Sequence, residues 1–501
     1  MAASTGSAQA GELRHGAVGL LQTFGQSFAL LALALGSATG TTAVAGYAGA
    51  ATPLVYVLGG IASLCLASVI IRFTKRMASS GGLYTFISRG LNPSAGFLGG
   101  WLYTMGFAAG ISFVMVIGST YLSTVLTDHL HVHLGWFPVF LILMVLLTFL
   151  ALVDIGLSLK AQLIAAGIGA TAILIGMFAV LFQGGAEGVS LQPFSPSHLG
   201  SVGDLFHGLV FAFGAFIGFE AAMVLGEEAK EPLKVIPRAV LTAVLTGLVF
   251  YVFVTFCLSI GFGPANAAEW AENPTAYDTI VTHYVGSGLA VVVDCAVALD
   301  AFVASLAATV LVSRVVFAMA REGGLPSPFG YTHPRFKTPW VGVLVSIVLT
   351  VILVTVLAYI KWDPFTYFAF MATAATFALL AAYILVAAAG VTYFWRERTL
   401  PHVRYNPALD LIAPVIAIAI CALTIYWSVV PEPPSPLNAA VWVTAGWLAL
   451  GIVILVWMKA TSPDKVARFG QTLGEEAEME RRPGDRLVDE PALAGGEHGE
   501  A

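Results

Sequence analysis

Long apolar runs separated by short polar segments dominate the chain. Each run has about 20 residues, the length of a helix that crosses the hydrocarbon core of a bilayer. The pattern predicts an all-α polytopic membrane protein with twelve transmembrane helices. We place these helices near residues 18–46, 52–73, 94–125, 135–154, 159–182, 204–226, 237–262, 286–318, 339–360, 364–394, 408–430 and 437–458.

Composition and charge agree with this prediction. Of the 501 residues, 58% are apolar and 10% are charged, and the mean hydropathy of +0.86 excludes a soluble domain of this length. If the N-terminus is cytoplasmic, 22 of the 23 Lys and Arg residues fall on inner segments, and Lys361 alone falls outside. This asymmetry supports twelve spans with both termini in the cytoplasm. No basic tract indicates a nucleic-acid partner.

The spans also divide the chain into segments. Residues 1–17 form an N-terminal cytoplasmic tail, and residues 459–501 form a polar, acidic and mobile C-terminal tail. Between them we expect two sets of five helices, at 18–203 and 204–406, and helices 11 and 12 at 407–458. The four cysteines each lie inside an apolar run, which argues against a disulfide framework or a zinc site.

Two predicted spans contain a glycine pair with a spacing of four at mid-depth. The pairs are Gly36 and Gly40 in span one, and Gly214 and Gly218 in span six. Each span opens a set of five, and because five is odd the second set crosses the membrane in the opposite sense. Corresponding broken helices in two halves indicate a transporter site at the midplane. Close helix packing is the alternative explanation of each pair.

A broken helix offers groups that suit a zwitterion. The N-terminal end of a half-helix presents unpaired N–H groups and a positive dipole to a carboxylate. The carbonyl groups at a C-terminal end suit an ammonium group or a cation. The two broken spans together therefore predict a site for a small molecule that carries both charges.

Acidic residues within the spans are the candidates for coupling. A carboxylate at the bilayer centre, such as Glu220 two residues after Gly218, costs about 2.5–3.5 kcal/mol, so its presence indicates a role. Span eight contains Asp294 near its outer end and Asp300 deeper. We expect Asp300 to carry a proton or to stay ionised beside a cation, with a structural hydrogen bond as the alternative. The hydroxyls of Ser305 and Thr309 could coordinate a cation or bond a carbonyl.

Three motifs carry a resemblance to a known family. They are RMASSGGLYTFISRGLNPSAGFLGGW at 76–101, FAFGAFIGFEAAMVLGEEAKEPLKVIPRAV at 211–240, and SRVVFAMAREGGLP followed by HPRFKTPW at 313–340. The chain resembles the amino acid–polyamine–organocation (APC) superfamily over about residues 15–460. The resemblance implies a five-plus-five inverted repeat with broken helices 1 and 6. It also implies secondary active transport of amino acids or related amines by alternating access.

The resemblance implies roles for individual residues. The substrate carboxylate would meet Ser37, Ala38, Thr39, Gly40 and Thr41, and the backbone around Phe213, Gly214 and Ala215 would hold the amino group beside Gly218, with Phe216 as an aromatic gate. The chain departs from the family in span five, which has no lysine past Lys160, and in span eight, where Asp300 replaces a small polar residue and Val310 an asparagine. The coupling residues expected are Asp300, Glu220, Ser305 and Thr309.

We therefore expect an amino acid permease of the plasma membrane that is coupled to protons. A transporter of polyamines or cationic amines, an amino acid exchanger and a non-transporting amino acid sensor remain as alternatives. An enzyme is not expected, because no serine–histidine, metal-ligand or paired-aspartate arrangement converges at membrane depth. The hypothesis needs no cofactor and no metal. The expected partners are the substrate, protons and the lipid bilayer.

Overall fold

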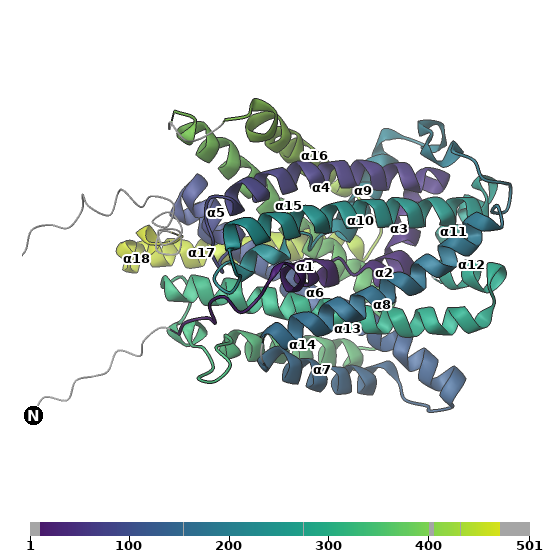
Figure 1. Cartoon of the computed structure of the whole chain (residues 1–501), viewed down its shortest axis with the longest axis horizontal. Coiled ribbons are helices and arrows are strands. Elements are labelled where there is room, and N and C mark those ends of the chain that lie inside the picture. The colour runs from purple at the N-terminus through teal and green to yellow at the C-terminus, as the bar shows by residue number, and fades with distance from the viewer. Residues whose placement is uncertain (1–10, 154, 274, 400–404, 431, 471–501) are drawn as a thin grey trace, which may run out of the picture.

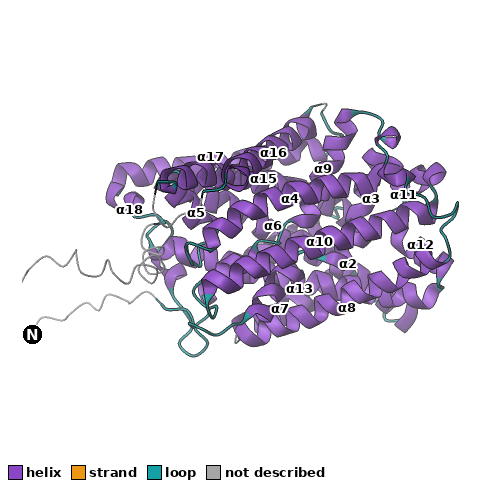
Figure 2. Cartoon of the chain, turned by 45° about the horizontal axis from the view of Figure 1, so that its top comes forward, coloured by secondary structure: helices purple, strands orange, loops and turns teal. Residues whose placement is uncertain are grey.

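The computed structural model describes residues 11–153, 155–273, 275–399, 405–430 and 432–470. Long helices run roughly side by side along the longest axis of the molecule (Figure 1). Within these residues the chain is helical and forms no β-strand beyond one isolated bridge between Val18 and Ala229 (Figure 2). The prediction of an all-α protein is confirmed.

The helices follow the predicted apolar runs. The first part of the chain forms α1 (Leu20–Leu30), α2 (Leu33–Leu35), α3 (Thr41–Ala48), α4 (Thr52–Thr74), α5 (Leu83–Gly90), α6 (Pro93–Leu130), α7 (Trp136–Leu152) and α8 (Ile155–Phe182). The second part forms α9 (Val202–Phe216), α10 (Pro232–Phe262), α11 (Ala267–Glu272), α12 (Ala276–Tyr284), α13 (Ser287–Arg321), α14 (Trp340–Tyr359) and α15 (Pro364–Glu397). The last helices are α16 (Ala413–Val429), α17 (Ala440–Thr461) and α18 (Pro463–Ala467).

The described residues contain ten helical stretches that are long and apolar enough to cross a membrane. The first stretch runs from Leu20 to Thr74 and has 55 residues, so it contains α1 to α4. The apolar helix α7 is shorter, with 17 residues. These helices make the chain a multi-pass membrane protein.

Local sequence explains where the long helices begin. The Asn92 side chain accepts a hydrogen bond from the Ala95 N–H at 2.9 Å, and Pro93 occupies the first turn of α6. Asp363 accepts in the same way from the Thr366 N–H at 2.8 Å, and Pro364 opens α15. A polar cap followed by proline is a strong helix start, because the cap satisfies an N–H that has no intrahelical acceptor.

Helix α13 forms the centre of the molecule. Every residue from Asp300 to Ala320 is buried, and most of these side chains are small or β-branched. By contrast, α17 exposes large apolar side chains, such as Val453 and Trp457, which are 64% and 65% exposed. In a membrane protein, apolar side chains exposed on the outer helices face lipid. The core that positions the site therefore surrounds α13.

The chain stays packed beyond the predicted start of the C-terminal tail at residue 459. After α18, Phe469 is fully buried and stacks on Phe97 with ring centroids 5.8 Å apart. The Gly470 N–H donates to the Glu322 carboxylate, and the Arg89 side chain donates to the Gly470 carbonyl at 3.0 Å. The boundary at 459 was placed too early, because a single buried aromatic residue in a polar segment gives no periodic signal. Residues 471–501 lie outside the described part.

Candidate functional site

The first helix breaks at Leu31 and Ala32. Ala32 has a left-handed φ of 47°, which ends α1 and lets α2 begin at Leu33. The prediction placed this break at the pair Gly36 and Gly40, where the chain instead forms a π-helical turn that continues into α3. Gly36 serves packing, since a Cβ atom there would overlap the Tyr251 hydroxyl.

Two side chains from other helices satisfy the backbone at this break. The Tyr251 hydroxyl of α10 donates to the Leu31 carbonyl at 2.8 Å. The Asp300 carboxylate of α13 accepts through Oδ2 from the N–H groups of Ala34 at 2.8 Å and Leu35 at 3.0 Å. The first N–H groups of a helix have no intrahelical acceptor, so Asp300 caps α2 from a neighbouring helix.

The second break lies at Ile217 and Gly218. Helix α9 ends at Phe216, Ile217 is extended, and Gly218 has a φ of 110°, a conformation that favours glycine. A Cβ atom at Gly218 would lie 2.8 Å from Leu30 Cγ and 2.9 Å from the Leu30 carbonyl carbon. The two breaks therefore touch each other, and the absence of a side chain at Gly218 permits the contact.

Glu220 holds the second break in place. Its carboxylate accepts from the Gly218 N–H at 3.1 Å, from the Tyr383 hydroxyl at 2.6 Å and from the Tyr103 hydroxyl at 3.2 Å. These contacts join the break to α15 and α6. Because the carboxylate is fully buried and surrounded by donors, its hydrogen bonds offset the cost of burying it.

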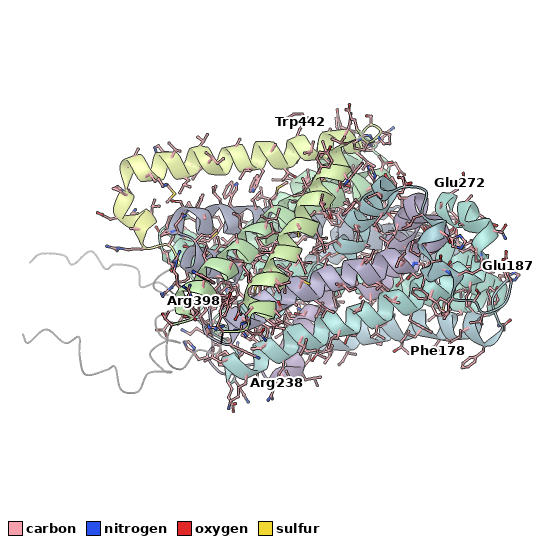
Figure 3. The ribbon with its side chains drawn as sticks, turned by 90° about the horizontal axis from the view of Figure 1, so that it is seen from above. Phe178, Glu187, Arg238, Glu272, Arg398 and Trp442 are labelled. Carbon is pink, nitrogen blue, oxygen red and sulfur yellow. The ribbon has the colours of Figure 1, made fainter. Side chains whose placement is uncertain are left out.

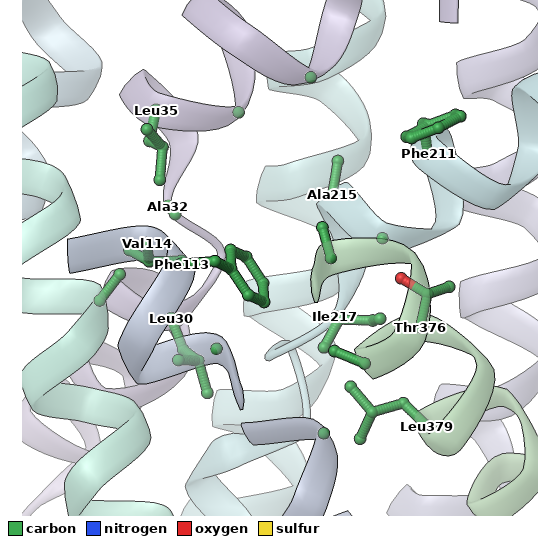
Figure 4. Close-up of a pocket in the computed structure, with 18 of the residues that line it drawn as sticks. Leu30, Ala32, Leu35, Phe113, Val114, Phe211, Ala215, Ile217, Thr376 and Leu379 are labelled. Atoms are coloured by element: carbon green, nitrogen blue, oxygen red, sulfur yellow. The ribbon is translucent and has the colours of Figure 1, made fainter. Parts of the chain in front are cut away.

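A cavity of about 150 Å³ lies where the two breaks meet α6, α13 and α15 (Figure 4). An apolar cavity of about this volume holds a molecule the size of benzene. Its lining carries no charged side chain, and the polar side chains that reach it are those of Thr39, Tyr251, Thr373 and Thr376. Most of the lining is small or apolar, including Leu30, Phe113, Phe211, Ile217, Ala304, Ala308 and Leu379.

Four of the ten predicted substrate-binding residues line this cavity: Thr39, Gly40, Gly214 and Ala215. Ser37, Ala38 and Thr41 are buried in the π turn and α3, and the hydroxyls of Ser37 and Thr41 donate to the carbonyls of Leu33 and Ser37 within their own helix.

The predicted binding residues Phe213, Phe216 and Gly218 lie outside the lining. Phe216, the predicted gate, packs between Tyr56 and Tyr251, at ring-centroid distances of 6.4 and 5.8 Å. Phe213 packs on Tyr383 at 6.0 Å. Both phenylalanines are buried, and they pack against other aromatic side chains without reaching the cavity.

The predicted coupling residues are all buried, and none of them lines the cavity. Asp300 and Glu220 each hold one break. Thr309 donates to the Ser305 carbonyl at 2.8 Å, one turn earlier on α13. The Ser305 hydroxyl is buried without a hydrogen-bond partner.

Sequence reasoning placed the site between spans one, three, six and eight, and it missed span ten, which is α15. Gly110 and Phe113 of α6 and Thr376 of α15 line the cavity. Gly110 has open space around it, since no atom lies within 4 Å of a Cβ built there. An unexplained glycine is a weak signal, and the small residues of span ten gave none.

A pair of acidic side chains lies outside the cavity, between α12 and α13. Asp278 and Asp294 interact through their side chains, and the Oδ1 atom of each is buried without a hydrogen-bond donor. Burial, followed by the charge of Asp294, raises the pKa of Asp278 to about 7. Tyr121, Asp128 and His129 of α6 face the pair.

This pair predicts a pH-dependent stability. The folded pKa of Asp278 lies above its unfolded value of 3.8. Its contribution is therefore complete below pH 3.8 and is lost as the pH rises toward 7 and just beyond. Between pH 6 and pH 8 we expect a loss of about 1 kcal/mol. Thermal unfolding in detergent should show this decline for the wild type and a flatter profile for Asp278→Asn; equal profiles would contradict it.

The helical bundle, its two breaks and the cavity between them define a membrane transporter, and comparisons with known proteins agree. A family model described as "Amino acid permease" matches residues 21–467. The chain belongs to the amino acid permease family.

Relatives within this family differ in substrate. The chain is 27% identical over 437 residues to the branched-chain amino acid permease BcaP of Bacillus subtilis, covering 83% of this chain and 87% of the relative. It is 24% identical over 443 residues to the low-affinity putrescine importer PlaP of Escherichia coli, covering 85% and 90%. The serine/threonine exchanger SteT of Bacillus subtilis is 26% identical over 350 residues, covering 68% and 77%. These relatives confirm a transporter rather than an enzyme.

Solved structures show the same fold. A mutant of the Eremococcus coleocola manganese transporter superposes with a TM-score of 0.54 at 11% identity, and the match covers 92% of this chain and 99% of that chain. At this identity the likeness describes the fold alone.

Proposed function

We propose that this chain is a secondary active permease of the plasma membrane that moves a neutral, apolar amino acid by alternating access. The observation that carries the proposal is the uncharged, largely apolar cavity at the two helix breaks. An apolar lining binds an aliphatic side chain, and polar backbone groups at a break bind the charged ends of the amino acid.

The same lining argues against a cationic amine as the main substrate. A diamine brought into a low-dielectric site requires an acidic partner. Glu220 and Asp300 are the nearby acids of the two breaks, but neither lines the cavity, and each already accepts hydrogen bonds from protein groups. Competition by putrescine as strong as that by leucine would favour the amine transporter.

The binding mode follows from the breaks. We place the substrate carboxylate at the start of α2, beside Thr39 and Gly40. The amino group is placed at the carbonyl end of α9, around Gly214 and Ala215. The other predicted binding residues, Ser37, Ala38, Thr41, Phe213, Phe216 and Gly218, support this site without contacting the substrate.

The architecture we propose has twelve spans and a five-plus-five inverted repeat. The stretch Leu20–Thr74 is long enough for two spans, and α7 supplies another despite its length. The repeats correspond to α1–α8 and α9–α15, and each opens with a broken helix. Arg238 and Arg398 lie toward one end of the bundle, and Glu187 and Glu272 lie at the other (Figure 3). The basic end is cytoplasmic in this proposal, as are both termini.

Filling the cavity tests the substrate site. Gly110→Leu places a side chain where no atom lies within 4 Å. We expect purified protein in liposomes to take up leucine, and we expect Gly110→Leu to lower this uptake at least about ten-fold without loss of stability, because the new side chain occupies the volume of the substrate.

The matched control is Gly446→Leu on α17. This glycine also has open space around it but lies outside the cavity, so uptake should be unchanged. Wild-type uptake by Gly110→Leu, or equal loss in both variants, would argue against this cavity as the transport site.

A further inference from the structure

The N–H groups at the start of α2 are the anion-binding groups of the first break, and they are already occupied. A half-helix N-terminus attracts a carboxylate through its free N–H groups and its dipole. Here the Oδ2 atom of Asp300 accepts from two of them, Ala34 and Leu35, at 2.8 and 3.0 Å. A carboxylate of the protein therefore stands where the carboxylate of a substrate would bind.

The cavity offers little else to a substrate carboxylate. Its lining has no Lys, Arg or His, and the hydroxyl of Thr39 donates to the Leu35 carbonyl. Leu35 and Ala32 reach the cavity, so the occupied N–H groups lie at its edge. An amino acid in this cavity has to take these donors from Asp300 or leave its own carboxylate without strong donors, which is costly in an apolar site.

Few contacts other than the N–H groups of Ala34 and Leu35 hold the Asp300 carboxylate in its place. Its second oxygen, Oδ1, is buried and has no hydrogen-bond partner. Among the described residues no cationic side chain forms an ion pair with it. The helices packed against it present Gly169 of α8 and the neutral Tyr251 of α10. Once displaced from the N–H groups, the carboxylate would have no compensation as an anion, so it would take a proton.

We propose that the substrate carboxylate and the Asp300 carboxylate exchange at the N-terminus of α2, and that the displaced Asp300 takes up one proton from water. Protein with ionised Asp300, a zwitterionic amino acid and one proton combine to give the complex with protonated Asp300. The net charge of the complex is therefore one unit more positive than that of the free protein and the free amino acid together. This inference rests on the proposed function and supplies the mechanism by which amino acid binding is coupled to a proton.

The experiment is equilibrium binding of leucine to the purified protein in detergent between pH 5.5 and pH 8. For the wild type, we expect the Kd to rise about ten-fold per pH unit wherever Asp300 is ionised in the free protein. Calorimetry in buffers of different ionisation enthalpy should show uptake of one proton per leucine. Leucine keeps the same charge across this range, so the proton is taken up by the protein.

The variant Asp300→Ala removes the carboxylate that occupies the N–H groups of Ala34 and Leu35. We expect it to bind leucine with a Kd independent of pH and, at pH 8, more tightly than the wild type. A residue with only a structural role would weaken binding at every pH instead. Asp128→Asn, on another helix, is the control and should keep the wild-type pH dependence.

Each outcome bears on a different claim. Leucine binding to the wild type with no proton uptake and a Kd independent of pH overturns the exchange but leaves the proposed function intact. Failure of leucine and every other neutral amino acid to bind at any pH overturns the proposed function and the exchange with it. If Asp300→Ala does not fold, the proton uptake of the wild type alone decides.

Discussion

Glu228→Ala is expected to destabilise the protein by about 3–5 kcal/mol, because it leaves a buried charge without its partner. Arg314 of α13 donates to the Glu228 carboxylate through Nε at 2.6 Å and through Nη2 at 2.9 Å. The two side chains are 2% and 1% exposed. Two parallel hydrogen bonds from a guanidinium to a carboxylate are a strong interaction. Removal of one partner leaves the other charge buried and unpaired, which is costly. It fastens the segment after the second break to the central helix.

A neighbouring ion pair provides the matched control. Glu231 accepts from Lys234 at 2.8 Å, but the side chains are 67% and 68% exposed. Water and salt screen such a pair, so Glu231→Ala should change stability much less than Glu228→Ala does. Thermal unfolding in detergent compares the two variants directly. Equal midpoints would show that the buried pair contributes no more than a surface pair does.

Gly218→Ala is expected to have an effect of similar size, for a steric reason. The added Cβ atom would require a φ of 110°, which costs a side-chain-bearing residue about 1–3 kcal/mol. It would also press against the backbone carbon of Leu30 at 2.9 Å, and overpacking of this kind costs about 1–3 kcal/mol. Any movement that relieves this overlap separates the two breaks, so we expect transport to be lost together with stability.

Gly214→Ala separates this effect from a general intolerance of alanine in span six. Gly214 lies inside α9, and its nearest neighbour would be the Thr376 hydroxyl at 3.5 Å, an ordinary contact. Its stability should equal or slightly exceed that of the wild type, because alanine favours the helix. Stability that falls equally in Gly214→Ala and Gly218→Ala would contradict the account of the second break.

The helices were predictable because their signal is long and repeated. The positions of α4, α8, α10 and α14 follow runs of about 20 apolar residues, the length that a helix needs to cross a bilayer. The break at Gly218 was predicted as well, since a glycine followed by an intramembrane acid is rare. In contrast, the first break lies at Ala32, a residue with no local preference for a left-handed conformation.

The reason for the first break is tertiary. Tyr251 lies 220 residues from Leu31, and Asp300 lies 266 residues from Ala34. These side chains satisfy the free backbone groups at Ala32, so the break depends on contacts that no local pattern contains. The cavity lining from α15 was missed for the same reason, because its threonine and alanine residues acquire a role only when other helices surround them.

The role of Asp300 in coupling stays a prediction, and the structure shows the hydrogen bonds that this residue makes. An acid deep in span eight indicated a role in coupling, and a structural hydrogen bond was the alternative. The contacts with Ala34 and Leu35 are the structural hydrogen bonds of the alternative, and in the exchange we propose the same contacts also compete with the substrate carboxylate. Ser305 and Thr309 stay predictions as coupling residues.

The most direct test of the central claim is a structure of the protein determined with a bound neutral, apolar amino acid. The account predicts the amino acid in the cavity between the two breaks, with its carboxylate at the N–H groups of Ala34 and Leu35 and with Asp300 withdrawn from them. An amino acid bound elsewhere, or one bound in the cavity while Asp300 still holds both N–H groups, would contradict it.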